Sequence, residues 1–358
     1  MFSSDKKPKV LNVGIIGTGI FATETHLPTV KSIPTLKVVA CFNRTKKKAE
    51  EFAKKANIDP KNVHNSIDEL FANPEVDIID ALLPVECNLS IVEKAIQYNK
   101  PLCFEKPIAN NLESAEKIVE LCKNSKMPIL VLENFIYHKA VEIVKKNLKK
   151  IGDLIAFTYN STGPFNEDNK YLNTSWRQHP NHIGGFLSDG GVHQLAYLTE
   201  ILGQIESISA HTKQVRKESG TDDILFSSLK LKNNDVIGTF TYGSAFGATS
   251  KSTYLKVYGT KGTLFFDFSP KNELPIIKLK LGEYVKDYKK EEIIEINNKE
   301  DRSGVKSEFL NFYESVINND KSLLKSTPEK TFHHLAVIDA ALKSSAADGA
   351  SVKVECLA

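Results

Sequence analysis

The feature that most constrains the fold is a strand-and-turn pattern between residues 9 and 22. It begins with a nearly continuous apolar run, typical of a strand buried on both faces of a parallel sheet: Val10, Leu11, Val13, Ile15 and Ile16. The run ends in Gly17-Thr18-Gly19-Ile20-Phe21-Ala22, which matches the G-x-G-x-x-G/A pattern of a sharp turn from a strand into a helix.

This turn predicts a binding site for a dinucleotide. Gly17 permits the tight turn, Gly19 has no side chain to keep a pyrophosphate away, and Ala22 lets the helix pack close to the strand. The free N–H groups at the start of the helix then face the phosphates. A glycine-rich turn that binds no ligand is the alternative. We expect cofactor contacts from the whole turn: Gly17, Thr18, Gly19, Ile20 and Phe21.

Composition narrows the class of protein. A chain of 358 residues predicts two domains, and a formal net charge of +3 does not indicate nucleic-acid binding. The five cysteines are an odd number without C-x-x-C spacing, which favours free thiols in a reducing compartment over disulfides or a metal site. We find no pattern of a secretory signal or a membrane helix, so we expect a cytoplasmic protein without a membrane partner.

After the first helix, strand and helix patterns alternate. Strands are predicted at residues 36–42, 76–83, 101–104 and 128–132, and helices at residues 87–98 and 111–126. This alternation with short connections predicts a doubly wound parallel sheet. Ligands of such sheets bind beyond the carboxyl ends of the strands. We therefore expect the residues at those ends to face one crevice: Leu83, Pro84, Glu105, Lys106, Glu133 and Asn134.

Past about residue 150 the pattern changes to β-rich segments separated by turn residues, which predicts a largely antiparallel sheet. The expected strands are residues 154–160, 205–215, 224–231, 236–242, 253–258 and 263–268. Helices are expected at residues 191–202, 306–318 and 328–347. We therefore divide this α/β chain into an N-terminal domain, 1–135, and a C-terminal domain, 136–358.

The end of the second strand indicates which dinucleotide is bound. About twenty residues after the glycine turn, at the position that recognises the adenosine ribose in such folds, the chain has Asn43, Arg44 and Thr45. A carboxylate there would bond the 2′-hydroxyl of NAD, but this position has none. Arg44 and Thr45 instead offer a positive charge and a hydroxyl, which suit the 2′-phosphate of NADP. The alternative is a surface arginine that begins a helix.

Two further groups of residues could carry chemistry. Lys106 follows a strand and precedes Pro107, and a lysine held there could polarise a substrate oxygen or stabilise an alkoxide. Asp189 and His193 are four residues apart, so on a helix they would share one face, and a carboxylate can orient and charge a histidine that moves protons. Taken singly, a turn lysine and a capping aspartate are the plainer interpretations.

Trp176 and Arg177 lie just upstream, in a loop rich in Gly, Asn and Pro. This aromatic and cationic pair could contact the cofactor or line the pocket of a polyol or carbonyl substrate. It could also be a packed tryptophan beside a surface arginine. We expect no metal site, because Asp189 and His193 have no evident third ligand.

These motifs together resemble the Gfo/Idh/MocA family, the glucose–fructose oxidoreductase and inositol dehydrogenase-like enzymes. The resemblance spans nearly the whole chain, through Gly17-Thr18-Gly19 with Ala22, Glu105-Lys106-Pro107, Glu133-Asn134, Gly184-Gly185 with Asp189 and His193, and the stretch from Thr327 to Ser345.

The resemblance implies a fold and a catalytic set. The fold is an N-terminal Rossmann domain followed by a C-terminal α/β domain with an open, mostly antiparallel sheet, which often forms homo-oligomers. Lys106 corresponds to the catalytic lysine of the E-K-P motif, His193 to the acid/base, and Asp189 to its partner or a substrate ligand. One residue departs from the family pattern: Asn88 stands where a histidine is usual, which leaves the catalytic set intact.

The resulting hypothesis is an NADP(H)-dependent oxidoreductase that acts on a carbonyl or secondary alcohol of a sugar, polyol or small carbonyl compound. Residues 1–135 would bind NADP, and residues 136–358 would bind the substrate and form the oligomer. One alternative is a non-catalytic NADP-sensing regulator, but such proteins typically lack the lysine and the D-x-G-x-H set that this chain keeps. Lyase-type glycoside cleavage with tightly held NAD is disfavoured by Arg44.

Overall fold

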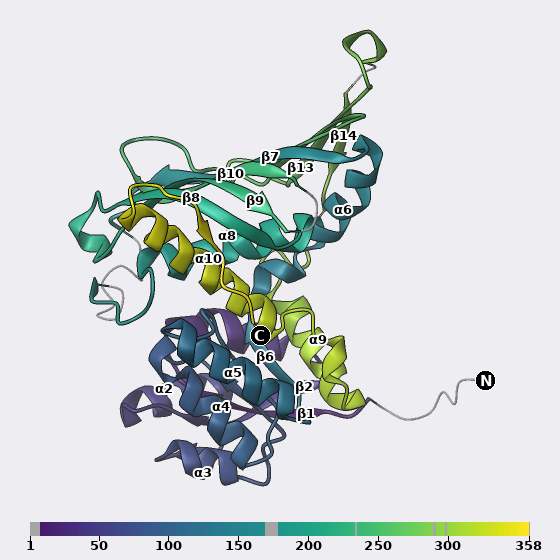
Figure 1. Cartoon of the computed structure of the whole chain (residues 1–358). Coiled ribbons are helices and arrows are strands. Elements are labelled where there is room, and N and C mark those ends of the chain that lie inside the picture. Colours follow the sequence, from purple (N-terminus) through teal and green to yellow (C-terminus); the bar gives the residue numbers. More distant parts are fainter. Residues whose placement is uncertain (1–7, 169–177, 233–234, 289–290, 298, 358) are drawn as a thin grey trace. The chain divides into compact units, whose positions relative to one another are not determined.

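The chain divides into two compact units (Figure 1). The structure is a computed structural model that describes residues 8–168, 178–232, 235–288, 291–297 and 299–357. Unit 1 comprises Met1–Ala109, Glu113–Asn134 and Val305–Pro328, and unit 2 comprises Asn110–Leu112, Phe135–Gly304 and Glu329–Ala358.

Unit 1 is built on a six-stranded parallel sheet of order β3-β2-β1-β4-β5-β6. The order reverses beside β1, which is the arrangement of a doubly wound sheet. The strands are β1 (Leu11–Ile16), β2 (Leu36–Phe42), β3 (Val63–His64), β4 (Ile78–Ala81), β5 (Leu102–Glu105) and β6 (Ile129–Leu132). Its helices include α1 (Leu27–Lys31), α2 (Lys46–Ala56), α3 (Ile67–Ala72), α4 (Asn88–Gln97) and α5 (Leu112–Asn124).

The helix α9 (Val305–Asn318) belongs to unit 1, although the division at residue 135 assigns it to the second domain. Tertiary contacts explain the difference. Phe309 of α9 meets the buried ring of His26 edge-on, with 5.2 Å between the ring centroids. Lys321 donates to the carbonyl oxygens of Lys123 and Ser125 at the end of α5, both at 2.7 Å, so a cation caps the negative end of that helix.

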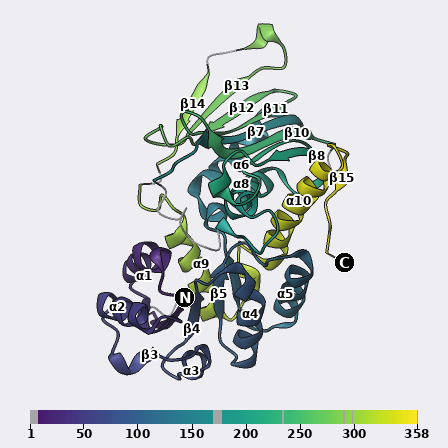
Figure 2. The same cartoon turned by 90° about the vertical axis from the view of Figure 1, so that its left-hand side faces the viewer.

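Unit 2 is built on a nine-stranded sheet of order β14-β13-β12-β11-β7-β10-β9-β8-β15 (Figure 2). All neighbouring strands are antiparallel except β7 and β10, which are parallel. The strands are β7 (Leu154–Pro164), β8 (Ile205–Lys213), β9 (Ile224–Leu231), β10 (Ile237–Phe246), β11 (Ser252–Gly259), β12 (Gly262–Asp267), β13 (Ile276–Leu281), β14 (Glu292–Glu295) and β15 (Val352–Lys353). The expected α/β fold with a parallel and a mostly antiparallel sheet is confirmed.

One face of the unit 2 sheet packs against helices, and this explains the alternation along its strands. Phe157, Tyr159 and Phe240 point to the covered face and are almost fully buried. The helices are α6 (Lys139–Leu148), α8 (Phe186–Leu202) and α10 (Pro328–Ala346) (Figure 2). The helix α8 begins five residues before the predicted start, because Gly184 and Gly185, both at positive φ, turn the chain into it. Among the described residues, no helix is long and apolar enough to span a bilayer.

Candidate functional site

The glycine turn lies where β1 ends. Gly17 has φ +91°, and a Cβ on it would lie 2.2 Å from the carbonyl oxygen of Leu82, so this position requires glycine. A Cβ on Gly19 would meet nothing within 4 Å. Thr18 is buried, and its hydroxyl has no hydrogen-bond partner in the described part of the chain. Open space at Gly19 and a buried hydroxyl beside it fit a pyrophosphate cradle.

Backbone hydrogen bonds join the ends of three strands at this turn. Gly17 N donates to Phe42 O at 2.9 Å, and Leu82 N donates to Ile16 O at 2.7 Å. The ends of β2 and β4 therefore lie against the turn. The segment after β4 carries Leu83 and Pro84, both half-buried. Ile20 is 38% exposed, and Phe21 is half-buried beside it.

The end of β2 presents Arg44 and Thr45 to solvent, with Asn43 half-buried before them. Asn43 Oδ1 accepts from Thr45 N at 2.8 Å, which folds the chain into the start of α2. Arg44 lies close enough to Cys87, in the segment after β4, to affect that thiol: burial raises the pKa of Cys87, the carboxylate of Glu86 raises it further, and Arg44 lowers it. Residues 43–45 include no acidic side chain, so the positive charge of Arg44 is not neutralised by a neighbour in this segment, where the adenosine ribose of the cofactor is expected.

Lys106 is half-buried and comes directly after β5, joined to Pro107 by a cis peptide bond. Asn134 comes after β6, separated from it by the buried Glu133. Because β5 and β6 are parallel neighbours in register from Leu102 to Glu105, both residues leave the sheet at the same edge.

A buried ion pair lies next to the end of β5. His26 Nδ1 is 2.8 Å from Asp80 Oδ2, and His26 Nε2 is 3.9 Å from Glu105 Oε1. Burial lowers the pKa of His26, but Asp80 and Glu105 outweigh this effect, so the pKa of the imidazole is raised. No sequence motif indicates His26, which lies in a π-helical turn, Ala22–His26, that begins at the last residue of the glycine motif.

Glu308 of α9 faces the same cluster. It is 1% exposed. Burial raises the pKa of Glu308 well above its usual range, and the nearby carboxylates of Glu105, Glu133 and Asp80 raise it further. The backbone N–H of Glu133 opposes this effect by hydrogen bonding. The arrangement favours a protonated Glu308 beside a charged His26–Asp80 pair.

In unit 2, Asp189 and His193 both lie on α8, one turn apart. This confirms that a helix carries them and that their side chains leave it on the same side. Phe135 stacks on the His193 ring with 4.6 Å between centroids and an interplanar angle of 18°, which limits the ring's rotation. Tyr242 of β10 lies close to Asp189. Burial raises the pKa of the Tyr242 phenol, and the negative charge of Asp189 raises this pKa further.

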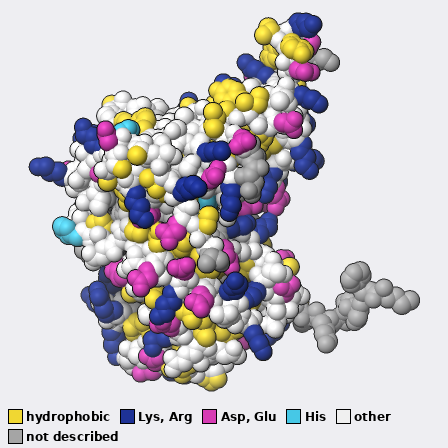
Figure 3. Space-filling model, in the orientation of Figure 1, with side chains coloured by type: hydrophobic (Ala, Val, Ile, Leu, Met, Phe, Trp, Pro, Cys, Tyr) yellow, Lys and Arg dark blue, Asp and Glu magenta, His cyan; other side chains and the backbone are white. Residues whose placement is uncertain are grey.

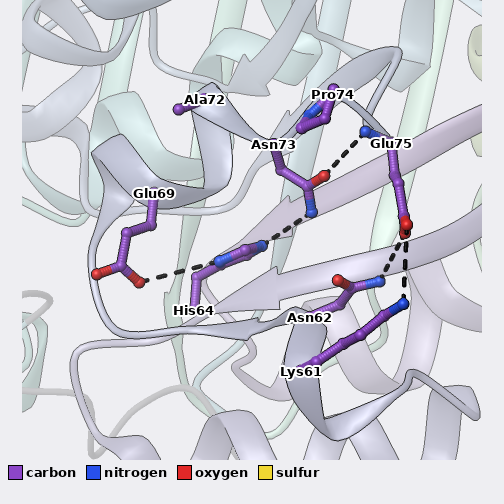
Figure 4. Close-up of a pocket in the computed structure, with 8 residues that line it drawn as sticks. All are labelled: Lys61, Asn62, His64, Glu69, Ala72, Asn73, Pro74 and Glu75. Atoms are coloured by element: carbon purple, nitrogen blue, oxygen red, sulfur yellow. Dashed lines mark hydrogen bonds and ion pairs between the residues drawn. The ribbon is translucent and has the colours of Figure 1, made fainter.

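Two predicted site residues, Trp176 and Arg177, lie outside the described residues. An open hollow of about 500 Å³ lies elsewhere in unit 1, around β3 and the end of α3 (Figure 4). It contains none of the predicted site residues, and its polar side chains bond one another: Asn62 donates to Glu75 at 3.0 Å, and Asn73 lies 3.1 Å from His64. The described residues contain no cluster of His, Cys, Asp and Glu that could hold a metal ion.

Family comparisons cover nearly all of the chain. Residues 11–132 match the family described as "Oxidoreductase family, NAD-binding Rossmann fold", and residues 145–354 match "Oxidoreductase family, C-terminal alpha/beta domain", the two halves of the Gfo/Idh/MocA pattern. The chain is 54% identical over 346 residues to the uncharacterized protein YMR315W of Saccharomyces cerevisiae, covering 96% of this chain and 99% of that protein.

Solved structures agree with this assignment. An oxidoreductase from Thermotoga maritima is 33% identical, with a TM-score of 0.83 over 97% of this chain and 99% of that one. A levoglucosan dehydrogenase in complex with NADH has a TM-score of 0.83 over 97% of this chain and 100% of that one. The latter is only 16% identical, so it shows a shared fold alone.

Proposed function

Because the chain belongs to the Gfo/Idh/MocA family of oxidoreductases, we propose that it is an NADP(H)-dependent dehydrogenase or reductase. It would transfer hydride between the nicotinamide and a carbonyl or secondary alcohol of a sugar, polyol or small carbonyl compound. The observation that carries the proposal is the glycine cradle joined by backbone hydrogen bonds to the acid-free end of β2.

The choice of NADP over NAD rests on charge. An acid at the end of β2 would repel a 2′-phosphate, whereas the exposed Arg44 can bond it with charge-assisted hydrogen bonds. Thr45, the N-cap residue of α2, adds a hydroxyl beside Arg44. The cofactor residues we propose are Gly17, Thr18, Gly19, Ile20, Phe21, Asn43, Arg44, Thr45, Leu83, Pro84, Glu105, Lys106, Asn134, Trp176 and Arg177.

The proposed chemistry divides between two side chains. When bound, the nicotinamide supplies or accepts the hydride. Hydride arrival at a carbonyl carbon leaves an alkoxide, which the ammonium of Lys106 stabilises. His193 delivers the proton that this alkoxide must gain, and Asp189 orients the imidazole or contacts the substrate.

The substrate class follows from family membership and from the name of one structural neighbour. One structure of the levoglucosan dehydrogenase is a complex with NADH and levoglucosan. A lysine and a histidine that hold a hydroxyl oxygen suit any secondary alcohol of this kind.

We also propose a homo-oligomer that pairs through the outer face of the unit 2 sheet. Phe226, Ile237 and Ile293 on this face are 49%, 59% and 58% exposed. The tip of the β13–β14 hairpin adds exposed apolar side chains, Tyr284 and Val285 among them (Figure 3). Light scattering after gel filtration tests this proposal, and a monomer at micromolar concentration would contradict it.

The experiment that tests the function has two parts. Fluorescence titration of the purified protein should show NADPH binding about tenfold or more tightly than NADH, as a charge-assisted phosphate contact predicts. A panel of sugars, polyols and small carbonyls is then followed at the nicotinamide absorbance. At least one should be turned over, and Lys106→Met should reduce that turnover by about 10³-fold. Tight binding without turnover across the panel would favour the regulatory alternative.

A further inference from the structure

The side chain of Asn88 bonds the main chain on both sides of Lys106. Asn88 is the first residue of α4 and is 1% exposed. Its Nδ2 lies 2.9 Å from the carbonyl oxygen of Glu105, 2.9 Å from that of Pro107 and 3.3 Å from that of Ile108. One amide nitrogen therefore serves three carbonyls that bracket Lys106 in the chain.

These bonds do not serve α4 itself. The N-terminal cap of α4 is Cys87, and it makes no side-chain capping bond. All three carbonyls that Asn88 contacts lie seventeen to twenty residues further along the chain, at the last residue of β5 and in the segment that follows it. The contact therefore organises the Lys106 segment rather than the helix that carries Asn88.

The chemistry of the carbonyls explains why an amide suits this place. Strand β5 ends at Glu105, and Pro107 and Ile108 are buried. Buried carbonyls beyond the end of a strand need donors other than the sheet. An asparagine amide offers two hydrogens, a neutral histidine offers one, and an ionised aspartate offers none. The histidine that the family resemblance leads one to expect here would supply one donor fewer.

We propose that Asn88 is a positioning residue, which fixes the direction of the Lys106 side chain by clamping the backbone before and after it. This inference rests on the proposed function for the role of Lys106 in turnover, but the clamp itself does not depend on it. A loosened segment would move the ammonium away from the reacting oxygen, and such displacement lowers turnover without a matching loss of cofactor binding.

The test uses a series graded by donors: wild type, Asn88→His, Asn88→Ala and Asn88→Asp. The matched control is Asn62→Ala, because Asn62 is also a buried asparagine of unit 1 but donates to Glu75 in the hollow of Figure 4. The first measurement is acetylation by acetic anhydride with mass spectrometry, in which the exposed Lys54 and Lys117 of the same sample serve as internal references.

Asn88→Ala should raise the acetylation rate of Lys106 about threefold or more relative to the references, because a loosened backbone exposes the amine. Asn62→Ala should leave that ratio unchanged. With the best substrate of the panel, kcat should fall in the order wild type, His, Ala, Asp, by about 10²-fold at Ala, with the Kd for NADPH within about twofold. The milder Asn88→His keeps the test usable if the alanine variant does not fold.

Equal acetylation of Lys106 in wild type and in folded Asn88→Ala, or in wild type and Asn88→His where the alanine variant does not fold, would overturn the clamp. An equal change of all three lysines would overturn it as well. A changed acetylation ratio together with full turnover in Lys106→Met would support the clamp and contradict the proposed function. The two inferences therefore fail in distinguishable ways.

Discussion

His26 Nδ1 and Asp80 Oδ2 lie 2.8 Å apart, and neither side chain is more than 1% exposed to solvent. A buried ion pair contributes to stability only when further hydrogen bonds and charges compensate for its desolvation. Here Glu105 lies 3.9 Å from the other ring nitrogen, and Glu308 and Glu133 add carboxyl groups nearby. The four carboxyl groups of Asp80, Glu105, Glu133 and Glu308 cannot all be ionised this close together without strong repulsion, and Glu308 is the one whose pKa is raised well above its usual range.

Replacing Glu308 with glutamine should therefore stabilise the protein at high pH. The unfolded carboxyl ionises near its ordinary pKa of 4.5, whereas the folded one resists ionisation. The wild type therefore keeps its full free energy of unfolding below about pH 4.5. Part of this free energy is lost as the pH rises toward the pKa of Glu308 in the folded protein. Glu308→Gln removes this loss, so its advantage should grow by at most about 1.4 kcal/mol per pH unit.

Urea unfolding at several pH values between 4 and 9 measures the difference. The effect of pH on His26 is present in both proteins and cancels. The exposed Glu113, changed to glutamine, is the control and should show no such trend. A variant less stable than the wild type by the same amount at every pH would mean that Glu308 is ionised when folded.

The two glycines of the turn should respond in opposite ways to alanine. In Gly19→Ala the new methyl group points into open space, so the unfolding free energy should stay within about 0.5 kcal/mol. NADPH affinity should fall about tenfold or more, because the methyl group occupies the place of the pyrophosphate. Gly17→Ala should unfold or be strongly destabilised, since its Cβ would lie 2.2 Å from Leu82 O.

Thermal unfolding and NADPH fluorescence titration of both variants test this pair. Unchanged affinity in a folded Gly19→Ala protein would place the pyrophosphate elsewhere. Reduced stability in Gly19→Ala, equal to that of Gly17→Ala, would show that the turn is only a structural feature.

Local patterns in the sequence are enough to predict the strand-turn-helix motif, the two kinds of sheet and the helix that carries Asp189 and His193. Each of these depends on periodicity or on turn residues within a few positions. The pattern places the start of α8 too late, because Gly190 and Gly191, residues disfavoured inside a helix, lie in its second turn. The pattern does not predict the strands β13 and β14, because charged residues stand among their few apolar ones: lysines in β13 and glutamates at both ends of β14.

Long-range features of the site could not be predicted. Glu308 is separated by more than two hundred residues from Asp80 and Glu105, and only the packing of α9 on unit 1 brings it to them. Asn88 gives no local signal, because its partners lie in another segment. Asp80, by contrast, does give a local signal. An aspartate inside the apolar run Ile78-Ile79-Asp80-Ala81 indicates a buried partner, and in the structure this partner is His26.

Arg44→Ala should weaken NADPH binding about tenfold or more and leave NADH binding unchanged within about twofold, because only NADPH carries the 2′-phosphate. Raising the salt concentration should reduce the preference in the wild type but not in the variant, since Arg44 is exposed. Fluorescence titration with both cofactors measures these effects. The matched control is Lys47→Ala, an exposed cation in α2 that should change neither affinity. Equal wild-type affinities for NADPH and NADH would contradict the choice of cofactor.

The last prediction concerns His193 as the proton carrier. A group that delivers the proton in carbonyl reduction acts in the transition state, so His193→Gln should lower kcat about 10²-fold or more, with the Kd for NADPH within about twofold. Asp189 lies one turn away on α8, and Asp189→Asn keeps the shape of that side chain but removes its charge, so it should lower kcat about tenfold. Steady-state kinetics with the best substrate of the panel measure both effects. The control is His211→Gln, which changes an exposed histidine on β8 and should leave kcat unchanged. Full turnover in His193→Gln would show that another group carries the proton, and Lys106 or the buried Tyr137 would then be tested in the same way.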